Sequence, residues 1–439
     1  MATTRLTKTF SSSGNRNKWT ISLWVKRGKL GSTQTLFACH QNSNYKTRLE
    51  IAADDELYFN DEYNGNTNGR IVSNAKLRDT NAWYHIVGIW DKDNSTSDDK
   101  IRFYINGSRI TSFSDTGNAP SNASTLNVDG QVHEFGSENS GNLFDGAMSH
   151  IHFCDGYAYE PTEFGETDAT TGEWKIKTSP SVSYGTNGFF ILKNGNGVTD
   201  QSPNSNDWTV AAGTLTKTED CPSNVFCTMN PLDNQNQAST FTMGNNKIEW
   251  NTNNKTNFAT MAVNKGKFYW EMKYANNAGG TDAMTGVCRE VSRDGSDWVG
   301  HDSHGWSYYA SNGNKYTGGS GSSYGNSWTT NNIIGVAFDA DTRTLWFSKD
   351  GVWQNSATIS EIAAGTTTNS AFTNFGTAGE FFFPATSGYD GNKIEFNFGN
   401  GYFSTTAITS AGSNASNIGL FEYDCPNNFT ALSTKGLNE

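Results

Sequence analysis

The stretch from Ile333 to Trp353 reads Ile-Ile-Gly-Val-Ala-Phe-Asp-Ala-Asp-Thr-Arg-Thr-Leu-Trp-Phe-Ser-Lys-Asp-Gly-Val-Trp. Large apolar residues occupy every second position from Ile334 to Phe338, and Leu345 and Phe347 repeat the pattern after an Asp-Ala-Asp-Thr turn. An apolar period of two residues on both sides of a turn predicts a β-hairpin. The Asp-Gly pair near the end of the stretch indicates a second tight turn.

The same pattern occurs earlier in the chain. Residues 83–90 read Trp-Tyr-His-Ile-Val-Gly-Ile-Trp, an acidic loop follows, and residues 101–105 read Ile-Arg-Phe-Tyr-Ile before an Asn-Gly pair. This segment is a second candidate hairpin. Two such hairpins in 439 residues indicate two related β domains, each with room for its own core.

Both hairpins carry a family resemblance. With Gly-Lys-Phe-Tyr-Trp-Glu at 266–271 upstream of it, the 333–353 hairpin resembles the SPRY family. With Trp-Thr-Ile-Ser-Leu-Trp-Val at 19–25 before it, the earlier hairpin resembles a laminin-G or pentraxin-like domain of the concanavalin A-like group. The resemblance implies an all-β fold of two antiparallel jelly-roll sandwiches joined by a packed irregular connector.

Composition shifts along the chain suggest the domain limits. We expect a laminin-G/concanavalin A-like sandwich at 1–160, a connector at 161–240, a SPRY-like sandwich at 241–420 and a C-terminal tail at 421–439. The connector is rich in Gly, Asn, Thr and Pro but contains isolated aromatic residues, so we expect it to pack against one or both sandwiches. Further strands are expected at 19–25, 36–38, 49–52, 57–59, 146–154, 247–250, 258–263, 267–274, 285–288, 380–384 and 393–398.

A short motif is repeated. Asp-Cys-Pro-Ser-Asn at 220–224 and Asp-Cys-Pro-Asn-Asn at 424–428 each precede a phenylalanine. Because proline holds the backbone extended, we expect each copy to end a structural unit and its phenylalanine to anchor the exit strand.

Charge and composition exclude several classes of partner. The net charge of -12 disfavours nucleic acid, whose binding depends on Lys and Arg neutralising phosphates. The first residues contain no apolar run typical of a signal peptide, and no later stretch has the length of a membrane span, so we expect no membrane insertion. In the reducing cytoplasm that this implies, the six cysteines are expected to be free thiols, with disulfides as the alternative.

Four motifs together carry a second resemblance. They are the opening Ser-Ser-Gly-Asn-Arg to Trp-Val-Lys-Arg stretch at 12–27, Phe-Gly-Glu-Thr-Asp at 164–168, Asn-Gly-Phe-Phe at 187–190, and the segment from Asp-Cys-Pro to Asn-Pro-Leu-Asp at 220–233. This set is similar to virion structural proteins of tailed bacteriophages, particularly marine ones. The resemblance implies assembly in the host cytoplasm, exposure on the particle surface, other virion proteins as partners, and homo-oligomerisation.

The region 298–309 contains the candidate ligand-binding residues Trp298, His301, Asp302, His304 and Trp306. Aromatic rings can stack on the apolar faces of sugars, while carboxylates and imidazoles bond the hydroxyls. The alternative is that the aromatic residues here are ordinary SPRY framework, with Trp306 the clearest case. The two histidines could also be read as metal ligands, although a loop pair without a third partner is typical of surface polar residues.

The loop at 91–99 is a candidate calcium site. Asp91, Asp93, Ser95 and Asp99 place oxygen atoms at alternate positions, as a hard cation prefers. The loop lacks glycine at its sixth position and an acid at its twelfth, so a solvated acidic hairpin loop is the alternative.

The sequence favours binding over catalysis. A glycanase needs two carboxylates facing one sugar, and Glu166 and Asp168 are a close acidic pair, but they lie among Gly and Thr with no strand to aim them. We therefore expect no enzyme. We expect a virion structural protein, exposed as a fibre, appendage or decoration, that attaches to a host-surface glycan or envelope protein. The alternatives are a purely architectural virion subunit and, third, a polysaccharide depolymerase.

Overall fold

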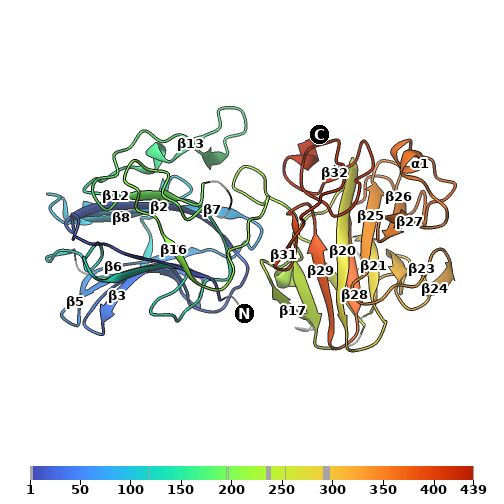
Figure 1. Ribbon diagram of the computed structural model, residues 1–439, viewed down its shortest axis with the longest axis horizontal. Helices are drawn as coiled ribbons and strands as arrows, with labels where there is room; N and C mark the ends of the chain where they lie inside the picture. The colour runs from blue at the N-terminus through green and yellow to red at the C-terminus, as the bar shows by residue number, and fades with distance from the viewer. Residues whose placement is uncertain are drawn as a thin grey trace. The chain divides into compact units, whose positions relative to one another are not determined.

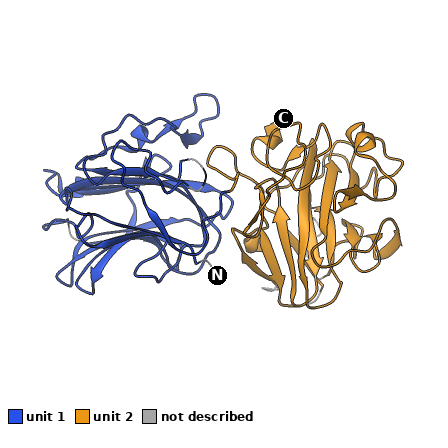
Figure 2. Cartoon of the chain, in the orientation of Figure 1, with its two compact units in different colours: residues 1–217 blue, residues 218–439 orange. Residues whose placement is uncertain are grey.

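The structure, a computed structural model, describes residues 3–117, 119–193, 195, 197–233, 239–252, 254–289 and 297–438. The chain divides into two compact units, residues 1–217 and 218–439, coloured blue and orange in Figure 2. Strands dominate both units, and in the described residues no helix combines the length and apolar character needed to cross a bilayer.

The first unit is a sandwich of two antiparallel sheets. Its core lies between them, where Leu49 and Phe59 of one sheet pack with Ile21 and Ile86 of the other. The eight-stranded sheet has the order β10 (Phe113–Thr116), β6 (Asn66–Lys76), β5 (Glu56–Tyr63), β4 (Tyr45–Ile51), β3 (Gln34–Asn42), β11 (Val132–Phe135), β1 (Arg5–Thr9), β16 (Thr209–Ala212). The six-stranded sheet has the order β15 (Phe189–Ile191), β12 (Gly146–Asp155), β2 (Lys18–Arg27), β7 (Trp83–Asp91), β8 (Ile101–Ile105), β9 (Ser108–Arg109).

The second unit is also a two-sheet sandwich (Figure 1). The larger sheet has the order β17 (Ser239–Thr242), β18 (Lys247–Trp250), β29 (Asn392–Asn397), β20 (Lys267–Asn277), β25 (Ile333–Asp339), β26 (Thr344–Lys349), β27 (Val352–Trp353), with β32 (Thr430–Ala431) parallel to β20. The smaller sheet has the order β19 (Lys255–Phe258), β28 (Phe382–Gly388), β21 (Met284–Arg289), β22 (Gly305–Tyr309), β23 (Asn314–Thr317), β24 (Ser320–Ser323).

The remaining elements are short. They are the strand pairs β13 (Gly165–Thr167) with β14 (Trp174–Ile176) and β30 (Tyr402–Phe403) with β31 (Thr406–Ala407), the helix α1 (Ile359–Ala363), and the 3-10 turns η1 (Ser97–Asp99), η2 (Pro161–Glu163), η3 (Pro231–Asp233) and η6 (Gly436–Asn438).

Both predicted hairpins are present, and the all-β fold of two sandwiches is confirmed. In the later hairpin Val336 faces Phe347 across the strands, and both side chains enter the core between the sheets. The positions between them are not solvated, because Ala337 and Trp346 pack in a second apolar cluster on the outer face of the larger sheet. Because both faces of these strands are buried, their sequences are nearly continuous apolar runs.

The segment expected to be a C-terminal tail covers that outer face. Phe421 and Phe429 are buried in the outer cluster, and β32 adds a short parallel strand beside β20. Residues 421–438 are therefore an integral part of the second sandwich, and its limits differ from the expected 241–420.

A buried glutamate holds the start of this segment. Glu271 of β20 has no exposed surface and accepts hydrogen bonds from the backbone N–H groups of Glu422 and Tyr423, both at 2.8 Å. Asn397 Nδ2 at 3.1 Å and the Tyr269 hydroxyl at 3.2 Å complete four donors to one carboxylate. Burial raises the pKa of Glu271 to about 7, even though the four donors favour the ionised form.

The expected connector is divided between the two units. Its first part belongs to the first sandwich, since β15 pairs with β12, β16 pairs with β1, and Trp208 lies in the core. The part from Thr218 onward belongs to the second unit. Aromatic residues in this stretch are thus core residues of the units, as the packed-connector interpretation requires.

The repeated Asp-Cys-Pro motif does not end each unit. The first copy opens the second unit, where Phe226 forms a β-bridge with Ser433, and Phe226 shares the outer apolar cluster with Phe429 of the second copy. The prediction of two exit strands is wrong for the first copy. These contacts of Phe226 join the beginning of the second unit to its end.

Candidate functional site

The loop at 297–304 is held against the smaller sheet of the second unit by buried anchors. Val299 is 1% exposed and packs with Phe258 and Cys288. Its N–H donates to Ser387 Oγ at 3.2 Å, and its carbonyl accepts from Ser307 Oγ at 2.6 Å. With Val299 fixed inward, the adjacent Trp298 remains half-buried at the surface.

Three aromatic side chains meet at this surface. The ring of Trp298 lies 5.4 Å from that of Tyr316 at 89°, and Tyr316 lies 5.5 Å from Tyr309 at 88°. His301 adds a fourth ring, 5.4 Å from Trp298 at 85°. These edge-to-face contacts fix a row of half-exposed rings, which we call the Trp298 surface (Trp298, His301, Tyr309, Tyr316).

Acidic groups flank the Trp298 surface. His301 Nδ1 lies 3.5 Å from Asp297 Oδ2, and His304 Nδ1 lies 3.1 Å from Asp302 Oδ2. The Asp302 side chain is 45% exposed and the His301 side chain 54%, so both can reach a ligand. At the Tyr309 end of the surface, the Tyr309 hydroxyl donates a hydrogen bond to Asp282. Burial, together with the nearby Asp282 carboxylate, raises the pKa of Tyr309 to about 12.

Of the five predicted ligand-binding residues, Trp298 and His301 are in contact at this surface, Asp302 and His304 pair with each other in the same loop, and Trp306 lies elsewhere. Trp306 is 5% exposed, and its ring packs 4.5 Å from Phe375 inside the core. The expectation of a ligand role for Trp306 is corrected, and the framework alternative holds for it, because Trp306 lies on the buried strand β22. Tyr309 and Tyr316 were not predicted, since their proximity to Trp298 depends on the pairing of β22 with β23.

At the candidate calcium loop, the three predicted carboxylates each have a cationic neighbour. Asp91 lies 3.1 Å from Lys18 Nζ, Asp99 lies 2.7 Å from Arg109, and Asp93 pairs with Lys92. Ser95 is exposed. Within the described residues, no group of three or more His, Cys, Asp or Glu side chains is arranged to hold a metal ion. Calcium binding at the 91–99 loop stays a prediction.

The acidic pair Glu166 and Asp168 was expected to lie outside any strand, but Glu166 lies on β13, which pairs with β14, so that expectation is wrong. Both carboxylates pair with Lys175, at 3.4 Å and 3.1 Å. Backbone N–H groups of Thr171 and Thr170, together with Lys175, lower the pKa of Asp168 to about 2. A carboxyl group with so low a pKa is a poor general acid.

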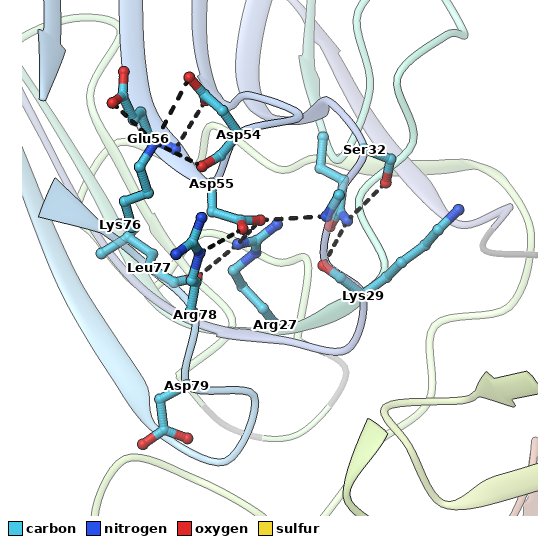
Figure 3. A network of polar contacts seen from close by, with 12 residues as sticks. Arg27, Lys29, Ser32, Asp54, Asp55, Glu56, Lys76, Leu77, Arg78 and Asp79 are labelled. Atoms are coloured by element: carbon cyan, nitrogen blue, oxygen red, sulfur yellow. Dashed lines mark hydrogen bonds and ion pairs between the residues drawn. The ribbon is translucent and has the colours of Figure 1, made fainter. Parts of the chain in front are cut away.

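A network of polar contacts in the first unit joins loops of the sandwich (Figure 3). Arg27 is 1% exposed and donates to Asp55 Oδ1 at 2.9 Å and to the Leu77 carbonyl at 2.6 Å. Burial opposes ionisation of Asp55, but hydrogen bonds from Arg78, Arg27 and the Gly31 N–H hold its pKa below the ordinary value. Arg27 is too deeply buried to contact a ligand. Asp55 joins its own loop to the segments that contain Gly31 and Arg78.

We expect Asp55→Asn to destabilise the first unit by about 3–5 kcal/mol, because it leaves the buried Arg27 charge without a counter-ion. Asn tolerates the positive φ of 73° at this position, so the backbone adds no strain. Arg78→Met is the matched control: its partner is the same carboxylate, but the Arg78 side chain is 59% exposed, and the expected cost is below about 1 kcal/mol. Urea unfolding measures both, and equal costs would contradict the assignment.

Two family models match the chain. Residues 4–163 match the concanavalin A-like lectin/glucanases superfamily, and residues 267–401 match the SPRY domain. The chain thus has an N-terminal laminin-G/concanavalin A-like domain and a C-terminal SPRY domain. The Trp298 surface lies inside the SPRY domain.

Solved structures similar to the chain include both kinds of domain. The SPRY domain of human HERC1 is 22% identical over 38% of this chain and 96% of that one, with a TM-score of 0.30. A human SPRY domain is 16% identical over 36% and 94%, with a TM-score of 0.28. A heptameric SAP-like pentraxin from Limulus polyphemus is 17% identical over 34% and 69%, with a TM-score of 0.26. No curated protein matches this chain.

Proposed function

We propose that this protein is a noncovalent recognition protein that binds a neutral host-surface glycan at the Trp298 surface. The observation that carries the proposal is the row of half-exposed rings of Trp298, Tyr316 and Tyr309, flanked by Asp302 and His301. Domains of the laminin-G-like and SPRY kinds are typically binding domains without catalysis, which supports a binding role.

The chemistry of the surface favours a sugar. Rings held in fixed orientations lose little entropy when a pyranose stacks on them, and the carboxylate and imidazole groups beside them can bond its hydroxyls. Because the chain carries a net charge of -12, a neutral glycan is favoured over an anionic one.

The particle role rests on the sequence. The four motifs shared with virion proteins of tailed phages support a virion subunit, exposed as a fibre, appendage or decoration and located on the particle surface. Other virion proteins and further copies of the chain would be its structural partners. Binding to an envelope protein and a purely architectural role are the competing possibilities.

Trp298→Ala is expected to weaken glycan binding by at least about 10-fold, because a central aromatic contact typically contributes most of the affinity at such a site. A glycan array identifies the ligand, and titration calorimetry with that glycan measures the change. Tyr157→Ala is the control, since Tyr157 is 39% exposed but lies in the first unit. It should leave the affinity unchanged.

The outcomes separate the alternatives. Failure of the full-length protein to bind any host polysaccharide, with or without calcium, would reject the glycan proposal and favour the architectural role. Equal affinity of Trp298→Ala and the unaltered protein would exclude the Trp298 surface. Shortening of a bound polysaccharide over hours would instead indicate a depolymerase.

A further inference from the structure

Residues 157–186, here called the cover, lie over the outer face of the six-stranded sheet in the first unit. Figure 1 shows β13, part of the cover, outside β12, β2 and β7. Phe164 of the cover is buried against Val87 and Ile89 of β7, with Tyr159 and Tyr184 packed around them. The cover continues from β12 without adding a strand to this sheet. Side-chain contacts hold it, together with a hydrogen bond from the Asp155 N–H to the Tyr184 carbonyl at 2.9 Å.

One of these contacts is a hydrogen bond to a buried histidine. His85 of β7 has no exposed surface, and its ring is stacked between Trp24 at 4.7 Å and Trp174 of the cover at 5.9 Å. Trp174 Nε1 donates to His85 Nδ1 at 2.9 Å. Because an indole nitrogen can only donate, Nδ1 must be unprotonated, and the proton of the neutral ring lies on Nε2, 2.9 Å from Ser22 Oγ.

A second histidine repeats the arrangement. His152 of β12 is 2% exposed and stacks 3.8 Å from Phe190, and its Nδ1 lies 2.9 Å from the hydroxyl of Tyr184 in the cover. The sheet therefore presents two buried imidazoles, and the cover contributes a polar group to each.

The surroundings of both rings disfavour a positive charge. In the described part of the chain, no carboxylate forms an ion pair with either histidine. Burial lowers the pKa of His85 to about 3. Burial, followed by the charges of His150, His85 and Lys193, lowers the pKa of His152 well below its ordinary value. The other titratable groups near this face are Cys154, Tyr184, Tyr104, Arg102, Glu160 and Asp200.

We propose that the cover is an acid-released strap, closed while His85 and His152 are neutral and opened when they take up protons. A proton on His85 Nδ1 would point at the N–H of Trp174 and replace a hydrogen bond by a contact between two donors. His85 and His152 therefore bind protons more weakly in the closed form than in the open form. Lowering the pH favours the open form for this reason.

The direction and size of the pH effect follow from the linkage between proton binding and opening of the cover. An exposed histidine has a pKa of about 6.5, so the stabilisation of the closed form is complete above that pH and declines as the pH falls below it. Each histidine changes the closed-to-open ratio about 10-fold per pH unit. Two histidines acting together give up to about 100-fold per unit well below pH 6.5, or roughly 2,500-fold between pH 6.5 and 4.5.

Hydrogen–deuterium exchange by mass spectrometry, corrected for the intrinsic pH dependence of exchange, tests this in the full-length protein. Between pH 7 and pH 4.5 we expect the amides of β13, β14 and Lys177 to lose at least 100-fold of their protection, while the β2–β7 ladder stays protected. Unchanged protection of the cover at pH 4.5 would overturn the proposal. Parallel loss in β2 and β7 would do so too, because it would indicate global acid unfolding.

Variants assign the effect to the two histidines. The double variant His85→Phe with His152→Phe keeps both rings and should abolish most of the pH dependence of cover protection. His133→Phe is the matched control, because His133 is 1% exposed and its pKa is lowered to about 4, yet it lies on β11 in the other sheet. It should respond to pH like the unaltered protein.

Trp174→Phe provides a test that alters no group of the sheet. It keeps a ring against His85 but removes the donor, so we expect weaker protection of the cover at pH 7 and a shallower pH dependence of that protection. A pH response identical to that of the unaltered protein would show that the Trp174–His85 hydrogen bond has no part in the release.

Discussion

Deletion of residues 421–439 is expected to abolish the folding transition of the second unit. The deleted segment contributes Phe421, Phe429 and Leu432, each at most 1% exposed, to apolar clusters of that unit. Burial of a large apolar side chain contributes about 1.5–3 kcal/mol, so these three alone account for roughly 5 kcal/mol or more. A typical domain has a net stability of only about 5–15 kcal/mol.

The deletion also removes two of the four donors to Glu271 and uncovers Tyr269 and Trp346 on the outer face of the sheet. Differential scanning calorimetry of the full-length and shortened chains should show loss of one transition and retention of the one that belongs to the first unit. Deletion from Leu437 onward is the control, since Leu437 is 45% exposed and should be dispensable. Two intact transitions after the long deletion would mean that the segment is a tail after all.

Substitution of Glu271 is expected to have the next largest effect. In Glu271→Ala, the N–H groups of Glu422 and Tyr423 lose their acceptor, and each unsatisfied buried donor costs about 1–3 kcal/mol. We expect the second unit to lose at least about 3 kcal/mol by urea unfolding. Glu249→Gln, which breaks the half-exposed pair with Lys393, should change stability by less than about 1 kcal/mol.

Glu271 also predicts a pH dependence with a definite sign. Its pKa rises from an ordinary 4.5 to about 7 on folding, so the folded state binds a proton that the unfolded state has released between those values. The contribution of Glu271 to the stability of the second unit is therefore greatest below pH 4.5 and falls by about 3 kcal/mol as the pH rises to 7. Glu271→Gln cannot titrate and should lack this decline. A decline of equal size in the variant would assign it to another group.

Much of the fold could be predicted from local pattern. The residues expected to form a strand at 247–250 coincide with β18, and both hairpins have the expected turns. The strand expected at 258–263 lies instead at Lys255–Phe258, because Val263 is buried through an isolated bridge to Phe382 rather than through a continuous ladder. Apolar residues indicate that a segment is buried, but they do not indicate which contacts bury it.

The candidate site could be predicted only in part. Trp298, His301, Asp302 and His304 are close in sequence, and their mixture of rings and polar groups is visible there. Tyr316 is separated from Trp298 by a strand and a turn, so its contribution depends on the fold. Trp306 lies in the same mixed region of the sequence, yet strand geometry directs its ring into the core.

The sequence by itself determined that the chain is built of β-strands and contains two hairpins, because alternation of apolar residues is a local property that each strand carries in its own side chains. The two antiparallel sandwiches were implied by the family resemblance. Tertiary structure alone decided what covers the outer faces of the sheets. Residues 421–438 cover one, the segment containing Trp174 and Tyr184 covers another, and Phe226 meets Phe429 across about half the chain. Such contacts join residues distant in sequence, and their stability comes from surfaces that exist only after the sheets have formed.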